Sequence, residues 1–180
     1  MRYLSSKGLM LTVTLEMEDA TIGGLVMATG MTFQSHRNGL VHDSVVAYEL
    51  VMPDGSFVRV DRQSCGSGTE HGDLFQALPW SHGTIGLLVA LELRVVPAVK
   101  YVKVKYTPFK TQAGYVKGMQ EALLSKTPCD TLEMIVFSKQ TAVMMQGTFV
   151  GLDGDGVSAA ELSSKMNNIS AWYKEWYFKH

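Results

Sequence analysis

The chain has 180 residues, of which 46% are hydrophobic and 18% are charged, the ordinary composition of a globular protein. Its formal net charge is −1 and no long run of one sign is present, which gives no electrostatic basis for a nucleic-acid partner. Two cysteines are too few for a disulfide scaffold, and no apolar run reaches the roughly 18–20 residues that a membrane-spanning helix needs.

The first predicted elements are the last turns of a helix over residues 2–8, closed by a glycine, and the start of a second helix at residues 21–24. The second start reads Thr-Ile-Gly-Gly, so its backbone N–H groups are exposed without a Cβ beside them. Such groups have no intrahelical acceptor, carry the positive end of the helix dipole and favour phosphate. Tight packing is the alternative reason for the glycines, and four residues do not decide between the two.

An antiparallel hairpin is predicted next. Residues 43–52 are rich in β-branched and aromatic side chains, Pro-Asp-Gly at 53–55 makes a turn, and residues 56–60 alternate as a returning strand. The glycine-rich residues 66–72 do not have the spacing of a dinucleotide-binding loop, and a flexible loop is expected there. A short helix opening at 73–75 and a buried strand at 85–91 follow, and the strand pattern continues to Pro97.

The second half of the chain begins with apolar and cationic residues alternating over 101–106, the pattern of a half-exposed strand. Residues 113–124 have helical spacing, and residues 132–137 and 141–149 are expected to form an antiparallel pair. Another helix is predicted at 157–167. A strand, a helix and two strands indicate an α+β unit.

The sequence predicts no metal site and no catalytic nucleophile. The five histidines lack metal-ligand spacing, and the Asp-Gly-Asp-Gly run at 153–156 lacks carboxylates at the first and twelfth positions of a calcium loop. No Gly-x-Ser-x-Gly turn is present, and Cys65 has no identifiable base.

The order of these elements and several short motifs resemble the FAD-binding domain of the vanillyl-alcohol-oxidase type flavoproteins, and within that group the sterol delta-24 reductases. The glycine motifs at residues 21–30 and 83–86 are shared by the wider group. Tyr-Glu-Leu-Val at 48–51, Pro-Trp-Ser at 79–81 and the aromatic and lysine run at 172–180 are typical of the reductases. The likeness covers nearly the whole chain.

The resemblance implies an α+β fold, with the second half of a PCMH-type FAD-binding domain at residues 1–97 and the start of an α+β cap or substrate domain at residues 98–180. In that family a loop that holds the cofactor pyrophosphate and an amino-terminal membrane anchor come earlier, and more of the substrate domain follows. The chain is therefore expected to be a fragment of a longer parent protein. By itself it is expected to bind FAD weakly or not at all and to be inactive.

The activity implied by the resemblance is reduction of the side-chain double bond of a delta-24 sterol, with FAD as cofactor and NADPH as reductant. The parent protein is expected at the endoplasmic reticulum membrane, although these 180 residues contain no targeting signal and no transmembrane segment. The candidate catalytic residue is His36, whose imidazole can titrate near neutral pH; a hydrogen bond to a loop is its alternative role. The cofactor-binding residues that the resemblance implies are Thr21, Ile22, Gly23, Gly24, Leu25, Met27, Ala28, Thr29, Gly30, Ser35, His36, Gly83, Thr84, Ile85 and Gly86.

Two other classes stay open. The alkyl-glycerone-phosphate synthases share the glycine motifs, although the runs at 48–51 and 79–81 argue against them. A non-enzymatic remnant that keeps the fold without binding flavin is the second class, and the visible absorbance of bound oxidised flavin separates it from an enzyme.

Overall fold

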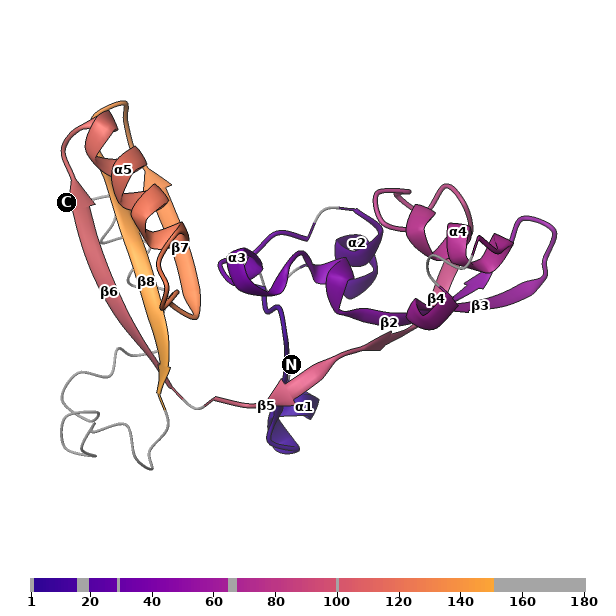
Figure 1. The fold of residues 1–180 in the computed structure, drawn as a ribbon. Coiled ribbons are helices and arrows are strands. Elements are labelled where there is room, and N and C mark those ends of the chain that lie inside the picture. Colours follow the sequence, from indigo (N-terminus) through magenta and orange to yellow (C-terminus); the bar gives the residue numbers. More distant parts are fainter. Residues whose placement is uncertain (1, 16–19, 29, 65–67, 100, 151–180) are drawn as a thin grey trace.

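A computed structural model describes residues 2–15, 20–28, 30–64, 68–99 and 101–150 of the chain. In these residues three antiparallel sheets are present, with strand orders β1-β5, β3-β2-β4 and β6-β8-β7. Figure 1 shows the third sheet, with helix α5 against it, standing apart from the second sheet, while the short helices α2 and α3 lie between them. Helices and antiparallel sheets thus confirm the predicted α+β class.

The β2–β3 hairpin forms as predicted. Strand β2 spans Val45–Val51 and pairs with β3, which spans Phe57–Asp61. In the turn, Gly55 has a φ of 84°, a left-handed conformation that glycine adopts without strain. The Asp54 carboxylate accepts hydrogen bonds from the Ser56 N–H and hydroxyl, which hold its pKa below the ordinary value. Local turn chemistry therefore sets the register of this hairpin.

The main core lies on one face of the second sheet. Strand β4, which spans Leu87–Leu93, pairs with the other side of β2, and helix α4, which spans Glu70–Ala77, packs against β3. The Tyr48 and Phe75 rings meet edge to face with their centroids 5.2 Å apart. Burial raises the pKa of the Tyr48 phenol to about 12. The core side chains come from β2 and β3, from α4 and the residue after it, and from the segments that precede β2. The buried set comprises Val13, Val26, Met27, Val41, Val45, Tyr48, Leu50, Val60, Phe75 and Leu78.

A two-stranded ribbon joins the ends of this unit. Helix α1 spans Arg2–Ser6 and leads through Gly8, at a φ of 68°, into β1 at Leu9–Leu11. Strand β1 pairs with β5, which spans Val95–Pro97 and directly precedes the second unit. The predicted helix end at Gly8 is confirmed.

The second unit contains the remaining elements in the predicted order. Strand β8 (Ala142–Val150) is central, between β6 (Tyr101–Phe109) and β7 (Thr131–Val136), and α5 (Gln112–Leu123) covers one face of the sheet. Thr111 caps α5 by accepting a hydrogen bond from the Gly114 N–H. The helix packs closely on the Phe109 ring, and a small core of Ala122, Leu132 and Met144 lies beneath it.

Three sequence-based expectations are wrong in part. Residues 70–72 are the first turn of α4, because Thr69 caps a helix there by accepting a hydrogen bond from the Gly72 N–H, so the expected loop is shorter. Strand β4 is not buried, since Leu87 and Val89 are 68% and 50% exposed on the face away from the core. Strand β6 is exposed on both faces, because α5 covers only the end near Phe109.

Other expectations concern residues outside the described part. The predicted helix at 157–167 and the aromatic run at 172–180 lie there, as does Thr29. The domain boundary after residue 97 stays a prediction. In the described ranges no helix combines the length and the apolar character that crossing a bilayer requires.

The remaining short helices connect these elements. They are α2 at Ile22–Met27, α3 at Ser35–Asn38, and the 3₁₀ turns η1 at Val41–Ser44 and η2 at Arg62–Ser64.

Candidate cofactor site

The predicted helix start at residue 21 is confirmed. Thr21 is extended, and its hydroxyl accepts a hydrogen bond of 3.2 Å from the Gly24 N–H. The Leu25 N–H donates to the Thr21 carbonyl, which begins the helical ladder. The N–H groups of Ile22 and Gly23 have no acceptor in the described part of the chain, and the Ile22 side chain is 47% exposed. Two unpaired, accessible N–H groups at a helix start suit an anionic ligand.

The second predicted cofactor segment lies directly beside the first. The His82 N–H donates a 2.8 Å hydrogen bond to the Met27 carbonyl at the end of α2. Ser81 and Thr84 close the turn between them, where the Thr84 hydroxyl donates to the Ser81 carbonyl over 2.6 Å. The structure thus brings together two segments that are more than fifty residues apart in sequence.

The backbone of this second segment is strained. Trp80 and His82 have φ values of 71° and 51°, in the left-handed region that non-glycine residues seldom occupy, and Gly83 follows at 77°. The Trp80 indole is 55% exposed and meets the His42 ring edge to face. Strain of this kind persists where the surrounding structure imposes it, and it is common at ligand sites.

The glycines of the two segments have different roles. A Cβ on Gly30 would lie 2.6 Å from Val41 Cγ2, and a Cβ on Gly86 would lie 3.2 Å from the Val51 carbonyl oxygen, so protein atoms already occupy both spaces. A Cβ on Gly24 would lie 3.0 Å from the capping hydroxyl of Thr21. In contrast, a Cβ on Gly23 would make only an ordinary contact with Leu88, and Gly83 faces open space. Gly23 and Gly83 therefore leave room for a ligand.

The apolar members of the predicted set serve the core. Met27 is buried, and Leu25 and Ile85 pack against the main core, so only their backbone atoms are available to a ligand. Ala28 ends α2, and its N–H donates to the Gly24 carbonyl.

Ser35 and His36 lie on α3 and have partners other than the α2 segment. The Ser35 hydroxyl accepts a hydrogen bond of 2.9 Å from the Thr32 N–H. His36 Nε2 lies 2.9 Å from the Cys129 carbonyl oxygen in the second unit, and because that oxygen can only accept, Nε2 carries the proton. The other ring nitrogen of His36, Nδ1, is buried without a hydrogen-bond partner in the described residues.

Sequence reasoning missed the residues that join α3 to the second unit. Arg37 makes an ion pair with Asp130, and the other oxygen of that carboxylate accepts a 2.7 Å hydrogen bond from the Phe149 N–H. The Leu132 N–H donates to the Phe33 carbonyl over 2.7 Å. No local pattern could have indicated these pairs, because Arg37 and Asp130 are 93 residues apart. We call this set of contacts the α3 junction.

The residues present fit one edge of a flavin dinucleotide site. The unpaired N–H groups of Ile22 and Gly23 would face a phosphate, and Gly23 and Gly83 leave space for the ligand to approach the backbone. Residues 21–28 and 80–86, which form the two segments, contain no carboxylate side chain of their own.

Comparisons with known proteins show which proteins this chain resembles. Residues 1–61 match the family described as FAD binding domain. The chain is 41% identical over 184 residues to the Delta(24)-sterol reductase of Homo sapiens and 40% identical to that of Rattus norvegicus, in each case over 98% of this chain. It is 35% identical over 185 residues to the Delta(24)-sterol reductase of Pisum sativum, over 96% of this chain. The chain spans about a third of the length of these relatives, 31%, 31% and 30% respectively.

Proposed function

Because this chain belongs to the FAD-binding proteins of the Delta(24)-sterol reductase type, we propose that it is part of an enzyme that reduces the side-chain double bond of a delta-24 sterol. We use "parent protein" for that longer enzyme. FAD is its proposed cofactor and NADPH its proposed reductant. The 180-residue chain alone is proposed to bind FAD weakly and to be inactive, because it supplies only one edge of the cofactor site.

One observation carries the proposal. The identity of 40–41% to mammalian sterol reductases extends over 98% of the chain, and therefore through both the FAD-binding segment and the second unit. A match restricted to the glycine motifs would indicate only the cofactor, because one fold hosts many chemistries. A match that includes the unit after residue 97 supports the substrate class as well.

The proposed roles of the residues follow from the site. The N–H groups of Ile22 and Gly23 would bind the pyrophosphate, and the Gly83 turn would lie along the cofactor from its other side. When bound, the flavin supplies hydride transfer, and the protein supplies orientation and electrostatics. The strained turn from Trp80 to Gly83 would hold that orientation, since His82 is hydrogen-bonded to the end of α2.

For His36 we propose a positioning role in place of proton transfer. Its Nε2–H donates to the Cys129 carbonyl, so the ring links the FAD-binding segment to the unit that follows it. Two variants of the parent protein separate the roles. Glutamine can still donate to the carbonyl but cannot transfer a proton near neutral pH, whereas alanine can do neither.

If His36 positions the second unit, His36→Gln keeps most of the turnover and His36→Ala loses it. If His36 transfers the proton, both variants lose roughly 10²-fold or more in turnover while their flavin content stays normal.

The substrate also bears on where the parent protein acts. A sterol is nearly insoluble in water, so we propose that the parent protein associates with a membrane, specifically that of the endoplasmic reticulum. Flotation of the parent protein with microsomal membranes is the measurement.

The deciding experiment supplies the purified parent protein with FAD and NADPH and offers it either a delta-24 sterol or an acylated glycerone phosphate. We expect mass spectrometry to detect a sterol product that is two mass units heavier than the delta-24 substrate. Conversion of the lipid phosphate without sterol reduction would assign the parent protein to the synthases that share its glycine motifs. A parent protein that purifies without flavin absorbance and shows neither activity would support the alternative that it is a non-enzymatic remnant of the fold.

A further inference from the structure

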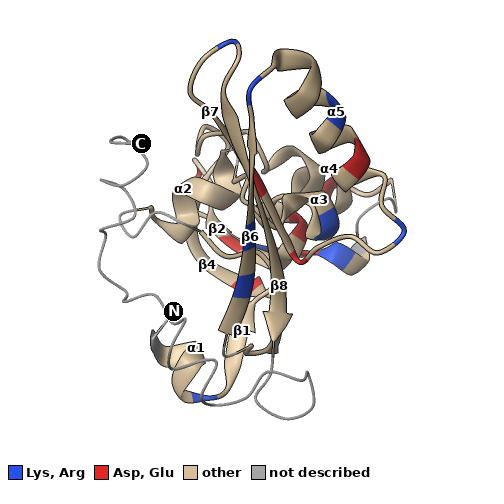
Figure 2. Cartoon of the chain, turned by 90° about the vertical axis from the view of Figure 1, so that its left-hand side faces the viewer, with Lys and Arg blue, Asp and Glu red and all other residues tan. Residues whose placement is uncertain are grey.

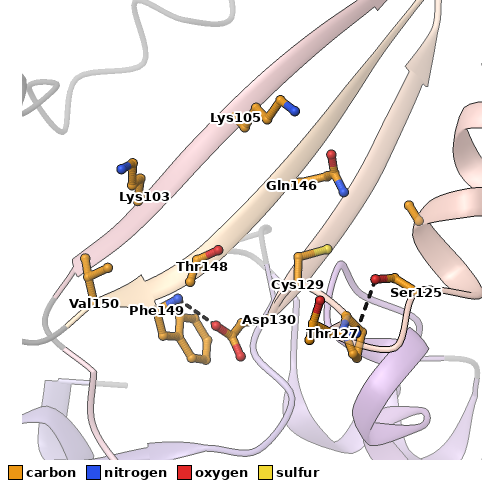
Figure 3. Close-up of a pocket in the computed structure, with 12 residues that line it drawn as sticks. Lys103, Lys105, Ser125, Thr127, Cys129, Asp130, Gln146, Thr148, Phe149 and Val150 are labelled. Atoms are coloured by element: carbon orange, nitrogen blue, oxygen red, sulfur yellow. Dashed lines mark hydrogen bonds between the residues drawn. The ribbon is translucent and has the colours of Figure 1, made fainter. Parts of the chain in front are cut away.

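A groove runs along the second unit on the face of the sheet that α5 leaves partly uncovered. It has a volume of about 750 Å³ and opens to solvent between β6, β8 and the segment after α5. Figure 3 shows Lys103 and Lys105 along one side on β6, Thr148 on β8, and Ser125 and Thr127 on the opposite side. We call this feature the lysine groove. Its lining contains no residue of the α2 segment or the Gly83 turn, and it borders the α3 junction through Cys129 and Asp130.

Two unpaired cations line this groove. Lys103 and Lys105 are alternate residues of β6, so they project from the same face, about 6.5 Å apart along the strand. Both are exposed, and neither takes part in an ion pair with any described residue. Strand β6 itself contains no acidic residue, and Figure 2 shows positive charge along it. Two like charges held close together without a counterion favour a multiply charged anion.

The carboxylate in the groove does not cancel this charge. Asp130 lines it, but one of its oxygens pairs with Arg37 and the other accepts from the Phe149 N–H. Its negative charge is thus already balanced by a cation that the groove does not contain. Counting only the described residues, the two lysines therefore give the groove a net positive charge.

Three other lining residues, Ser125, Thr127 and Thr148, carry short hydroxyl side chains. Thr148 lies opposite Lys103 in the β6–β8 register. On the far side, Ser125 accepts from the Thr127 N–H at 3.2 Å, which leaves the Ser125 hydroxyl proton available. Hydroxyl donors facing a pair of ammonium groups are complementary to the oxygens of a phosphate. The groove also has apolar lining residues, Ala122, Pro128, Phe149 and Val150, which can contact the rest of a phosphorylated ligand.

We propose that the lysine groove binds the phosphate group of a small phosphorylated ligand, with Lys103 and Lys105 as the charged contacts and Thr148 as a hydrogen-bond donor. A soluble diphosphate such as a nicotinamide dinucleotide and the headgroup of an anionic lipid both carry this chemistry. The inference does not depend on the sterol reductase activity, because it rests on charge and geometry in the second unit alone.

The test measures binding to the purified 180-residue chain by titration calorimetry with pyrophosphate and NADPH, and by sedimentation with phosphatidate vesicles against neutral phosphatidylcholine vesicles. The test variant is Lys103→Gln with Lys105→Gln. The control, Lys110→Gln with Lys139→Gln, removes the same charge at the opposite end of the sheet, where Phe109 pairs with Ala142. All four lysines are exposed, and matched thermal unfolding of the variants checks their folding.

We expect saturable binding that weakens at least tenfold in the Lys103/Lys105 variant, changes less than threefold in the control, and falls as salt is raised. Response to pyrophosphate and NADPH assigns the groove to a soluble ligand, and response to phosphatidate vesicles alone assigns it to a lipid headgroup. Absence of saturable binding to every probe, or equal losses in the two double variants, overturns the proposal.

Discussion

Replacing two glycines by alanine separates protein packing from ligand contact. At Gly30 an added Cβ would lie 2.6 Å from Val41 Cγ2 and 2.7 Å from Val41 Cβ, about 1 Å closer than an ordinary carbon–carbon contact. Val41 is buried and cannot swing away, so the neighbourhood must shift. Overpacking of this kind costs about 1–3 kcal/mol. For a chain of this size, that lowers the unfolding midpoint by about 2–12 °C.

At Gly23 the same substitution meets different surroundings. The added Cβ would lie 3.8 Å from Leu88 Cδ2, an ordinary contact, and alanine in a helix is favoured over glycine by about 0.5–1 kcal/mol. The free energy of unfolding should therefore stay the same or rise slightly. In the parent protein, however, the Cβ would stand where the flavin dinucleotide approaches the backbone, and the variant should purify with much less flavin.

The assays are thermal unfolding of the 180-residue chain and flavin absorbance of the parent protein. A Gly23→Ala parent that keeps normal flavin content would refute the placement of the cofactor against α2. A Gly30→Ala chain that unfolds at the wild-type temperature would refute the packing argument, because Val41 would then have room to move.

Three further predictions concern stability and association. Tyr48→Phe should raise the unfolding free energy by up to about 1 kcal/mol, because the buried Tyr48 hydroxyl has no described partner. Because folding raises the pKa of that phenol from 10.0 to about 12, the unfolding free energy of the wild-type chain should fall as the pH rises from 10 toward 12. Alkaline denaturation of the Phe variant should lack this loss. In urea unfolding, Arg37→Ala should lower the unfolding free energy by about 0.5 kcal/mol, because the side chains of its ion pair with Asp130 are 41% and 23% exposed. Asp130→Ala should lower it by about 1–3 kcal/mol, because this change also leaves the Phe149 N–H unpaired. Equal losses for the two variants would contradict the account of the α3 junction. The chain should self-associate on size-exclusion chromatography through the exposed face of β4, and Leu87→Lys with Val89→Lys should reduce this; a wild-type chain that elutes as a monomer would contradict it.

Features that depend on neighbouring residues were predictable from the sequence. The cap at Thr21 joins atoms three residues apart, and the Pro-Asp-Gly turn closes the β2–β3 hairpin within four residues. The helical spacing in α5 expresses the period of its own backbone, whereas the alternation in β6 predicted the strand but not its exposure on both faces. Short motifs were also sufficient to indicate the flavoprotein resemblance, because they occupy consecutive positions.

Features that depend on which segments of the chain come into contact required the tertiary structure. The partners of His36 and Arg37 are 93 residues away, and the atom that excludes a side chain from Gly30 belongs to Val41 in the next turn. The apolar run in β4 predicted a buried strand, yet only one of its faces meets the core. A sequence records which side chains can be buried, but the contacts between distant segments decide which of them are. For the same reason the open space at Gly23 and the filled space at Gly30 look alike in the sequence and differ only in the folded chain.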